Sequence, residues 1–198
     1  MPEVMGRQGA RERVRRRMLG ERGASAIEAA LVTPVVIALL FGIIELGFVF
    51  KDYLAVAGAV RSGVRIASAN PRTSTFAQIA ANNVASTGGA MNFNDVQQLW
   101  VYKVDTLTDK PIGFTDFSDC TICVKFHWVA SSRSFVTTSD NWSASTQYAC
   151  SAPPGPDRIG VYLQLKHNAF TKLVFSSVNI AEASILTLEP MPVLSGCK

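Results

Sequence analysis

The sequence predicts an α+β protein, in which a long N-terminal membrane-spanning helix continues into an extracytoplasmic domain with a mostly antiparallel sheet and a short packed helix. Three observations predict this class. Residues 24–50 are apolar apart from Glu28 and Glu45. Apolar residues at helical spacing continue beyond that run to about residue 69. Further along, several segments alternate apolar and polar residues with the period of two of half-buried strands.

Charge is concentrated at the N-terminus. Residues 1–23 hold seven arginines and three glutamates, so their balance of 7 − 3 = +4 equals the net charge of the whole chain. We interpret them as a basic cytoplasmic leader; a solvated tail without another role is the alternative. The remaining residues have no net charge, so we expect no nucleic-acid partner, because phosphate-driven binding needs a basic face.

Residues 24–70 are predicted to form a transmembrane and extended amphipathic helix. At about 1.5 Å per residue, the apolar run exceeds the roughly 30 Å of a bilayer core. The basic flank places the N-terminus in the cytoplasm and the later residues outside. Asn70-Pro71 should end the helix. The residues that continue its apolar face are Leu54, Ala57, Val60, Val64 and Ala67.

A secretory signal peptide is a rival interpretation, because Ala55-Val56-Ala57 has the small-residue pattern of a cleavage site that would leave Gly58 first. Two features argue against it. Lys51 and Asp52 separate the apolar run from that site, and the run is longer than the core of a typical signal peptide.

The leader, Gly23, Glu28 five residues later, the apolar helix and the stretch AVRSGVRIAS together resemble the TadE-like family of minor pilins and pseudopilins, from the Tad (Flp, type IVc) pilus systems of bacteria. The tail SVNIAEASILTLEP resembles that family's closing strand. The resemblance implies cleavage by a prepilin peptidase between Gly23 and Ala24. It also implies the membrane, other pilin-type subunits and pilus assembly machinery as partners. The aromatic residue that often follows the glutamate in the family is Ala29 here.

Glu28 is the residue that an ordinary membrane span would not contain. A charge in hydrocarbon costs about 2.5–3.5 kcal/mol on insertion scales and usually marks function. The resemblance implies that Glu28 packs against a neighbouring subunit, whose freed N-terminal ammonium balances the carboxylate and sets the register between helices. A solvated interfacial carboxylate is the alternative. Glu45 is expected near the outer interface, where it reaches water.

Residues 71–198 are predicted to form the extracytoplasmic α+β domain. STFAQIAANNVAS predicts a short helix that ends at Gly88-Gly89. Residues 131–157 are expected to be mostly loop. Strands are expected near 99–104 and at 121–129, 159–167 and 183–189. The aromatic residues of the loop, expected to pack beneath it rather than to form a partner surface, are Phe135, Trp142 and Tyr148.

The cysteines all fall in the part predicted outside, where an even number favours disulfides. We expect the pairs Cys120–Cys123, through a turn, and Cys150–Cys197. The second pair follows if strands 159–167 and 183–189 are antiparallel neighbours. If strand 121–129 also runs antiparallel to 159–167, the first pair lies at the opposite end of the sheet. A zinc site and a thioredoxin-like role are both disfavoured.

No catalytic set is recognisable, since the sequence lacks the usual hydrolase, zinc-protease and phosphate-loop motifs. His127 and His167 are expected to be half-exposed sheet residues, and Asp116 and Asp119 to lie in turns. We therefore expect no enzyme, no catalytic residue, no cofactor and no metal. The first hypothesis is a membrane-held minor pilin or pseudopilin taking part in assembly or initiation of a Tad-type pilus. The alternative is a single-span anchored cell-surface binding protein, and both belong in the bacterial cell membrane.

Overall fold

The computed structural model describes residues 5–172 and 175–192. Within them the chain forms helices α1 (Met5–Ser68) and α2 (Phe76–Thr87) and strands β1 (Val96–Lys103), β2 (Cys123–Val129), β3 (Ser134–Asp140), β4 (Arg158–Asn168) and β5 (Ser177–Thr187). The chain divides into two compact units, Met1–Leu46 and Gly47–Lys198. Helix α1 contributes residues to both units, so the boundary falls inside the helix predicted over residues 24–70.

Helix α1 is longer at its start than the sequence predicts. It begins at Met5, so the residues expected as a leader are helical from that residue onward. It ends at Ser68, close to the expected stop at Asn70-Pro71. Asn70 Nδ2 donates a hydrogen bond of 2.8 Å to the carbonyl of Ile66, which gives a partner to one of the carbonyls that a helix leaves open at its C-terminus.

Within the described residues, five antiparallel strands form one sheet in the order β3-β2-β1-β4-β5. Strand β1 lies at its centre, and Tyr102 of β1 stands opposite both Cys123 of β2 and Gly160 of β4. Strands β4 and β5 pair along the whole of their length. The α+β class with an antiparallel sheet, a long helix and a short helix is therefore confirmed.

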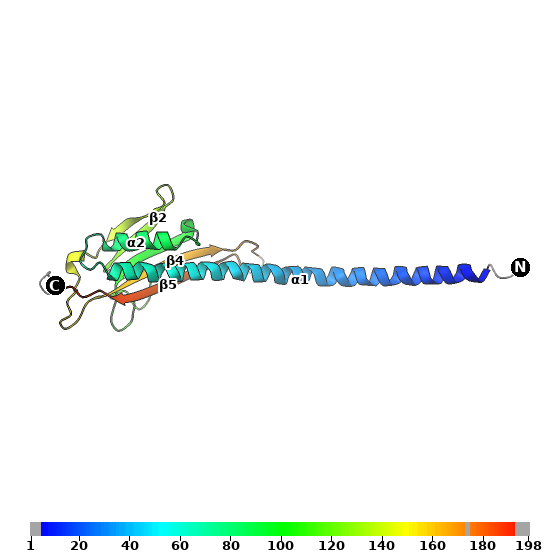
Figure 1. Ribbon diagram of the computed structural model, residues 1–198, viewed down its shortest axis with the longest axis horizontal. Helices are drawn as coiled ribbons and strands as arrows, with labels where there is room; N and C mark the ends of the chain where they lie inside the picture. Colours follow the sequence, from blue (N-terminus) through cyan, green and yellow to red (C-terminus); the bar gives the residue numbers. More distant parts are fainter. Residues whose placement is uncertain (1–4, 173–174, 193–198) are drawn as a thin grey trace. The chain divides into compact units, whose positions relative to one another are not determined.

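One face of the sheet packs against α2 and the C-terminal part of α1, which lie on the same side of it (Figure 1). Of the residues predicted to continue the apolar face of α1, Leu54 is exposed and the other four, from Ala57 to Ala67, are buried. A Cβ added at Gly63 would lie 2.7 Å from Val84 Cγ2, so the close approach of the two helices depends on this glycine. The core residues from the central strands are Leu99, Val101, Val124, Phe126, Val161, Leu163 and Leu165.

Strand β3 differs from the prediction that residues 131–157 are mostly loop. It pairs with β2 at the edge of the sheet. Its centre, Phe135 to Thr138, is aromatic or β-branched and suits a pleated surface, but only Phe135 is buried. A polar, exposed edge strand lacks the apolar alternation that reveals a strand in a sequence.

Buried side chains hold the rest of residues 131–157 against the folded unit. Trp142 packs edge-on against Phe76 of α2, with ring centroids 5.2 Å apart. The Arg72 backbone N–H donates to Gln147 Oε1 at 2.6 Å, and its guanidinium donates to the Gln147 carbonyl at 2.8 Å. Trp142 is buried, so the prediction that it packs beneath the loop is confirmed. Phe135 is also buried but lies in β3, and Tyr148 is half-buried.

The opposite face of the sheet carries a second buried cluster around Trp100, Tyr102 and Tyr162. Phe117, from the connection between β1 and β2, stacks on Tyr162 with ring centroids 4.1 Å apart. Tyr102 is fully buried, and this desolvation raises the pKa of its phenol far above the ordinary value. The phenol is therefore neutral at physiological pH.

Gly160 leaves the space that the Tyr102 ring fills. A Cβ added at Gly160 would lie 2.3 Å from Tyr102 Cζ, and the buried ring has no open side to move into. We expect Gly160→Ala to lower the free energy of unfolding by about 1–3 kcal/mol, the usual cost of overpacking. The measurement is thermal or urea denaturation of the full chain in detergent.

The matched control is Gly58→Ala in α1, where no atom lies within 4 Å of the new Cβ. The same substitution should there be neutral or stabilising by up to about 1 kcal/mol, because alanine has the higher helix propensity. Equal destabilisation by the two variants would show that contact with Tyr102 is not the cause.

Candidate membrane span and subunit-packing segment

Gly23, Ala24 and Glu28 all lie on α1 with exposed surfaces. No atom lies within 4 Å of the place that a Cβ would take at Gly23. Glu28 follows about 7.5 Å further along the helix axis, and it forms no ion pair with the residues that the structure describes. The Gly23–Ala24 peptide bond and the Glu28 carboxylate are thus both open to a partner outside this chain.

The surface of α1 after Glu28 is apolar and exposed. The most apolar window of Gly23–Ser68 has a mean hydropathy of 2.4, and none of it is buried. Thr33, just before Pro34, donates its hydroxyl to the Ala29 carbonyl at 2.6 Å, so it presents no unpaired donor to hydrocarbon. The large apolar side chains exposed along this stretch are Leu31, Val32, Val35, Val36, Ile37, Leu39, Leu40, Phe41, Ile43, Ile44 and Leu46.

Across the part of the chain that the structure describes, α1 is the one helix long and apolar enough to cross a membrane. The fold and this segment define a protein with a single candidate span that leads into an α+β unit. A family model described as TadE-like protein matches residues 23–65. This match confirms the resemblance over the segment that holds Gly23, Ala24 and Glu28. We found no significant match among curated proteins or solved structures.

The sequence predicts that Glu45 reaches interfacial water, but only 1% of its surface is exposed. Its place on the helix explains the difference. Val49, Asp52 and Val56 follow it at spacings of four, seven and eleven residues, which lie on one face of a helix. That face continues into the buried face of α1. Glu45 is therefore unsuitable as a solvent-exposed control for Glu28.

A buried polar pair joins α1 to the end of β4. His167 Nδ1 lies 2.7 Å from Asp52 Oδ2, and both side chains are almost fully buried. Lys51 Nζ lies 3.0 Å from the other carboxylate oxygen and is half-exposed. His167 Nε2 has no hydrogen-bond partner among the described residues. The pair satisfies two groups that would be costly to bury alone and ties the helix to the sheet at this point.

The prediction that His167 is half-exposed was therefore wrong, whereas His127 is exposed and lies 3.0 Å from Thr138 Oγ1. The signal for His167 was present in the sequence. Val161, Leu163 and Leu165 precede it at intervals of two, so strand alternation places His167 on the face that packs against α1.

The structure contains a disulfide between Cys120 and Cys123, with their Cα atoms 6.0 Å apart. The pairing Cys150–Cys197 involves Cys197, which lies outside the described residues. The expectation that the first two cysteines lie at the other end of the sheet from Cys150 was wrong. Strands β2 and β4 are both antiparallel to β1 and so run in the same direction, which brings their starting ends together.

The acidic residues before β2 form turns, as predicted. Asp116 Oδ1 accepts the Ser118 backbone N–H at 2.9 Å, and Asp119 Oδ1 accepts that of Cys120 at 2.8 Å. A hydrogen bond from Lys125 lowers the pKa of the Asp119 carboxyl. In the described ranges, no three His, Cys, Asp or Glu side chains gather as metal ligands would.

Proposed function

We propose that this chain is a membrane-held minor pilin or pseudopilin that takes part in the assembly or initiation of a Tad-type pilus. The observation that carries the proposal is the TadE-like match over residues 23–65. That segment contains Gly23, Ala24 and Glu28 and ends inside the folded unit formed by Gly47–Lys198. The proposed role is structural rather than catalytic, and it is performed by helix packing.

The proposed topology places the N-terminus in the cytoplasm and the sheet outside. Seven arginines precede the apolar run, whereas Lys51 is the first basic residue after it, and a basic flank remains on the cytoplasmic side. The exposed apolar surface of α1 can contact lipid in one state and the helices of neighbouring subunits in another. Glu28 then provides the charge that selects a partner with a free ammonium.

Processing by a prepilin peptidase is the test that separates this function from the alternatives. We expect N-terminal sequencing of the membrane-extracted protein to begin at Ala24. A start at Gly58 would instead identify signal peptidase. That outcome would also remove Val56 and Ala57, which are buried in the core of the folded unit. An uncleaved chain in cells that have a prepilin peptidase would also contradict the proposal.

Two glycine variants make this test specific. Gly23→Leu should block cleavage, because a peptidase site shaped for glycine has no room for a branched side chain. Gly42→Leu should be processed like the wild type, since Gly42 lies on the same helix with the same open space around its Cβ. Equal processing of the two variants would mean that the peptidase does not read Gly23.

One observation favours the alternative, a single-span anchored cell-surface binding protein. A cleft of about 790 Å³ lies beside α2 and the β2–β3 hairpin, and Phe93, Trp128 and Arg133 line it together with several Asn and Ser side chains. Such a mixture of aromatic and polar groups suits a small ligand. Loss of pilus assembly in a deletion strain, restored by the wild-type chain, would favour the pilin function over this one.

A further inference from the structure

The hairpin that joins β4 to β5 lies at the end of the folded unit where α1 enters it. Gly63 of α1 lies beside Val161 of β4, since a Cβ at Gly63 would be 3.7 Å from Val161 Cγ1. Asp52, earlier in the helix, bonds His167, later in the strand. Helix and strand therefore run in opposite directions. The end of β4 that holds His167 therefore lies at the end of the folded unit where its part of α1, from Gly47 onward, begins.

The described part of this tip combines an exposed aromatic ring with a cation. Phe170 lies three residues beyond His167, and 82% of its surface is exposed. Lys172 follows it, also exposed. The Ala169 backbone N–H donates to the Ser176 carbonyl at 3.0 Å, so the base of the tip continues the β4–β5 pairing. Phe170 thus follows directly after the last backbone hydrogen bond of the β4–β5 ladder.

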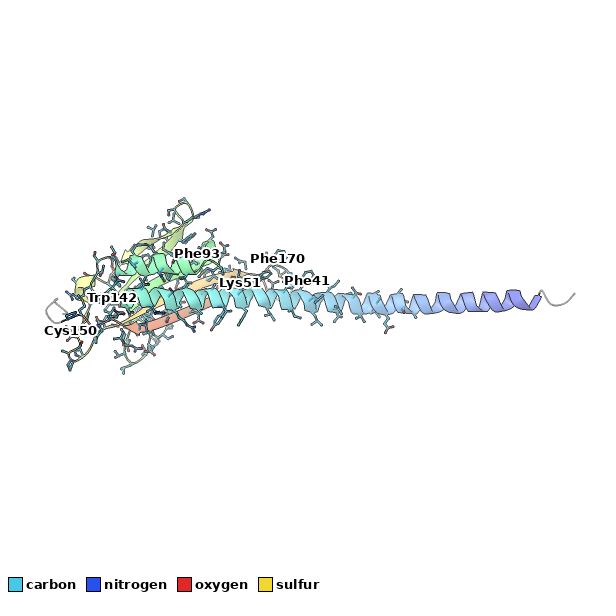
Figure 2. The ribbon with its side chains drawn as sticks, in the orientation of Figure 1. Phe41, Lys51, Phe93, Trp142, Cys150 and Phe170 are labelled. Atoms are coloured by element: carbon cyan, nitrogen blue, oxygen red, sulfur yellow. A yellow bond between two sulfur atoms is a disulfide. The ribbon has the colours of Figure 1, made fainter. Side chains whose placement is uncertain are left out.

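Helix α1 presents similar chemistry at the same end. Phe50 and Tyr53 are exposed, and their rings stack with centroids 6.4 Å apart. Lys51 lies between them with a half-exposed side chain. Aromatic rings and lysines are the residues that gather where a protein meets the headgroup region of a bilayer. Figure 2 shows Phe170 and Lys51 at one end of the folded unit, with Trp142 and Cys150 at the other.

We infer that the β4–β5 tip is a second membrane contact, in which Phe170 enters the interface of the same bilayer that α1 crosses and Lys172 meets its phosphate groups. A phenylalanine with 82% of its surface exposed is unfavourable in water and favourable in the interface. Two carboxylates behind the tip have partners of their own, because Asp52 bonds His167 and Asp95 accepts a hydrogen bond from Asn168 at 3.0 Å. Two membrane contacts, α1 and the tip, would restrain the motion of the folded unit relative to the bilayer before the protein is assembled with its partners.

Fluorescence quenching by lipid-borne nitroxide tests this inference on the full chain in phospholipid vesicles. No cysteine is free in the described residues, so a single introduced thiol can be labelled with an environment-sensitive dye without reduction, and the wild-type chain measures any background. The test variant is Phe170→Cys. Nitroxides near the lipid headgroup should quench its label, whereas nitroxides deep in the acyl chains should quench the label of Leu39→Cys, which lies in the apolar part of α1.

The matched control is Leu107→Cys. Leu107 is 93% exposed and follows the end of β1 that pairs near the start of β4, so it lies at the far end of the sheet. Its label should stay unquenched. Equal quenching at 107 and 170 would overturn the inference, as would an unquenched label at 170 while the label at 39 is quenched. A shifted but unquenched emission at 170 would identify a protein surface as its partner instead. Absence of quenching at 39 would contradict the membrane span on which this inference rests.

Discussion

Glu28→Gln is expected to leave membrane insertion intact and to weaken association with other pilin-type subunits by about two to three orders of magnitude. Insertion should survive because loss of the charge makes the segment more apolar. Association should suffer because the amide keeps the size of the side chain but cannot balance an ammonium. Removal of one partner from a buried pair costs about 3–5 kcal/mol, and about 1.4 kcal/mol is a factor of ten in affinity.

The measurement is crosslinking or co-purification with partner subunits, together with membrane fractionation and a check of processing at Gly23. Glu28→Asp retains the carboxylate and is the control for charge. A second control, Leu31→Gln, places an amide about one turn further along the exposed surface of α1. If Glu28→Gln is crosslinked as efficiently as the wild type, Glu28 is a solvated interfacial residue. If Leu31→Gln reduces crosslinking as much as Glu28→Gln does, the cause is the polar amide rather than the loss of the Glu28 charge.

Asp52→Ala is expected to destabilise the folded unit more than any exposed substitution. It leaves the buried His167 ring with neither nitrogen hydrogen-bonded among the described residues. An unsatisfied buried polar group costs about 1–3 kcal/mol, and the cost rises to about 3–5 kcal/mol if the imidazole is charged. Thermal denaturation of the full chain in detergent, followed by near-ultraviolet circular dichroism, measures the loss.

A double-mutant cycle with His167→Ala isolates the contact from the lost side-chain volume. The two single variants should each be destabilised. The double variant should be destabilised by clearly less than the sum of the two, because with both side chains removed no buried polar group is left without its hydrogen-bond partner. His127→Ala is the matched control, since this histidine is exposed, and its effect should stay within about 0.5 kcal/mol. Strict additivity of Asp52→Ala and His167→Ala would show that the pair contributes nothing as a unit.

Much of the fold could be predicted because its signals are local. Apolar residues at helical spacing predicted the long helix and placed its end within two residues of Ser68. Strict alternation over Val161 to Leu165 predicted β4. The segment of the candidate site was also visible locally, since Gly23, Glu28 and the apolar run that follows are read from consecutive residues. Periodicity works in these places because one face of each element is apolar along its whole length.

The sequence by itself determined the class of the protein, its candidate span and the segment that the TadE-like family model matches. Only the tertiary structure decided that Glu45 and Asp52 are buried on α1, that β3 completes the sheet, and that Asp52 meets His167 across 115 residues of chain. An edge strand with one buried residue has no periodic signal of its own, and its partner β2 supplies the hydrogen bonds that define it. The Asp52–His167 contact and the place of Phe170 depend on the opposite directions of α1 and β4. Such pairings between distant segments are set by the packing of the whole core, which no local pattern records.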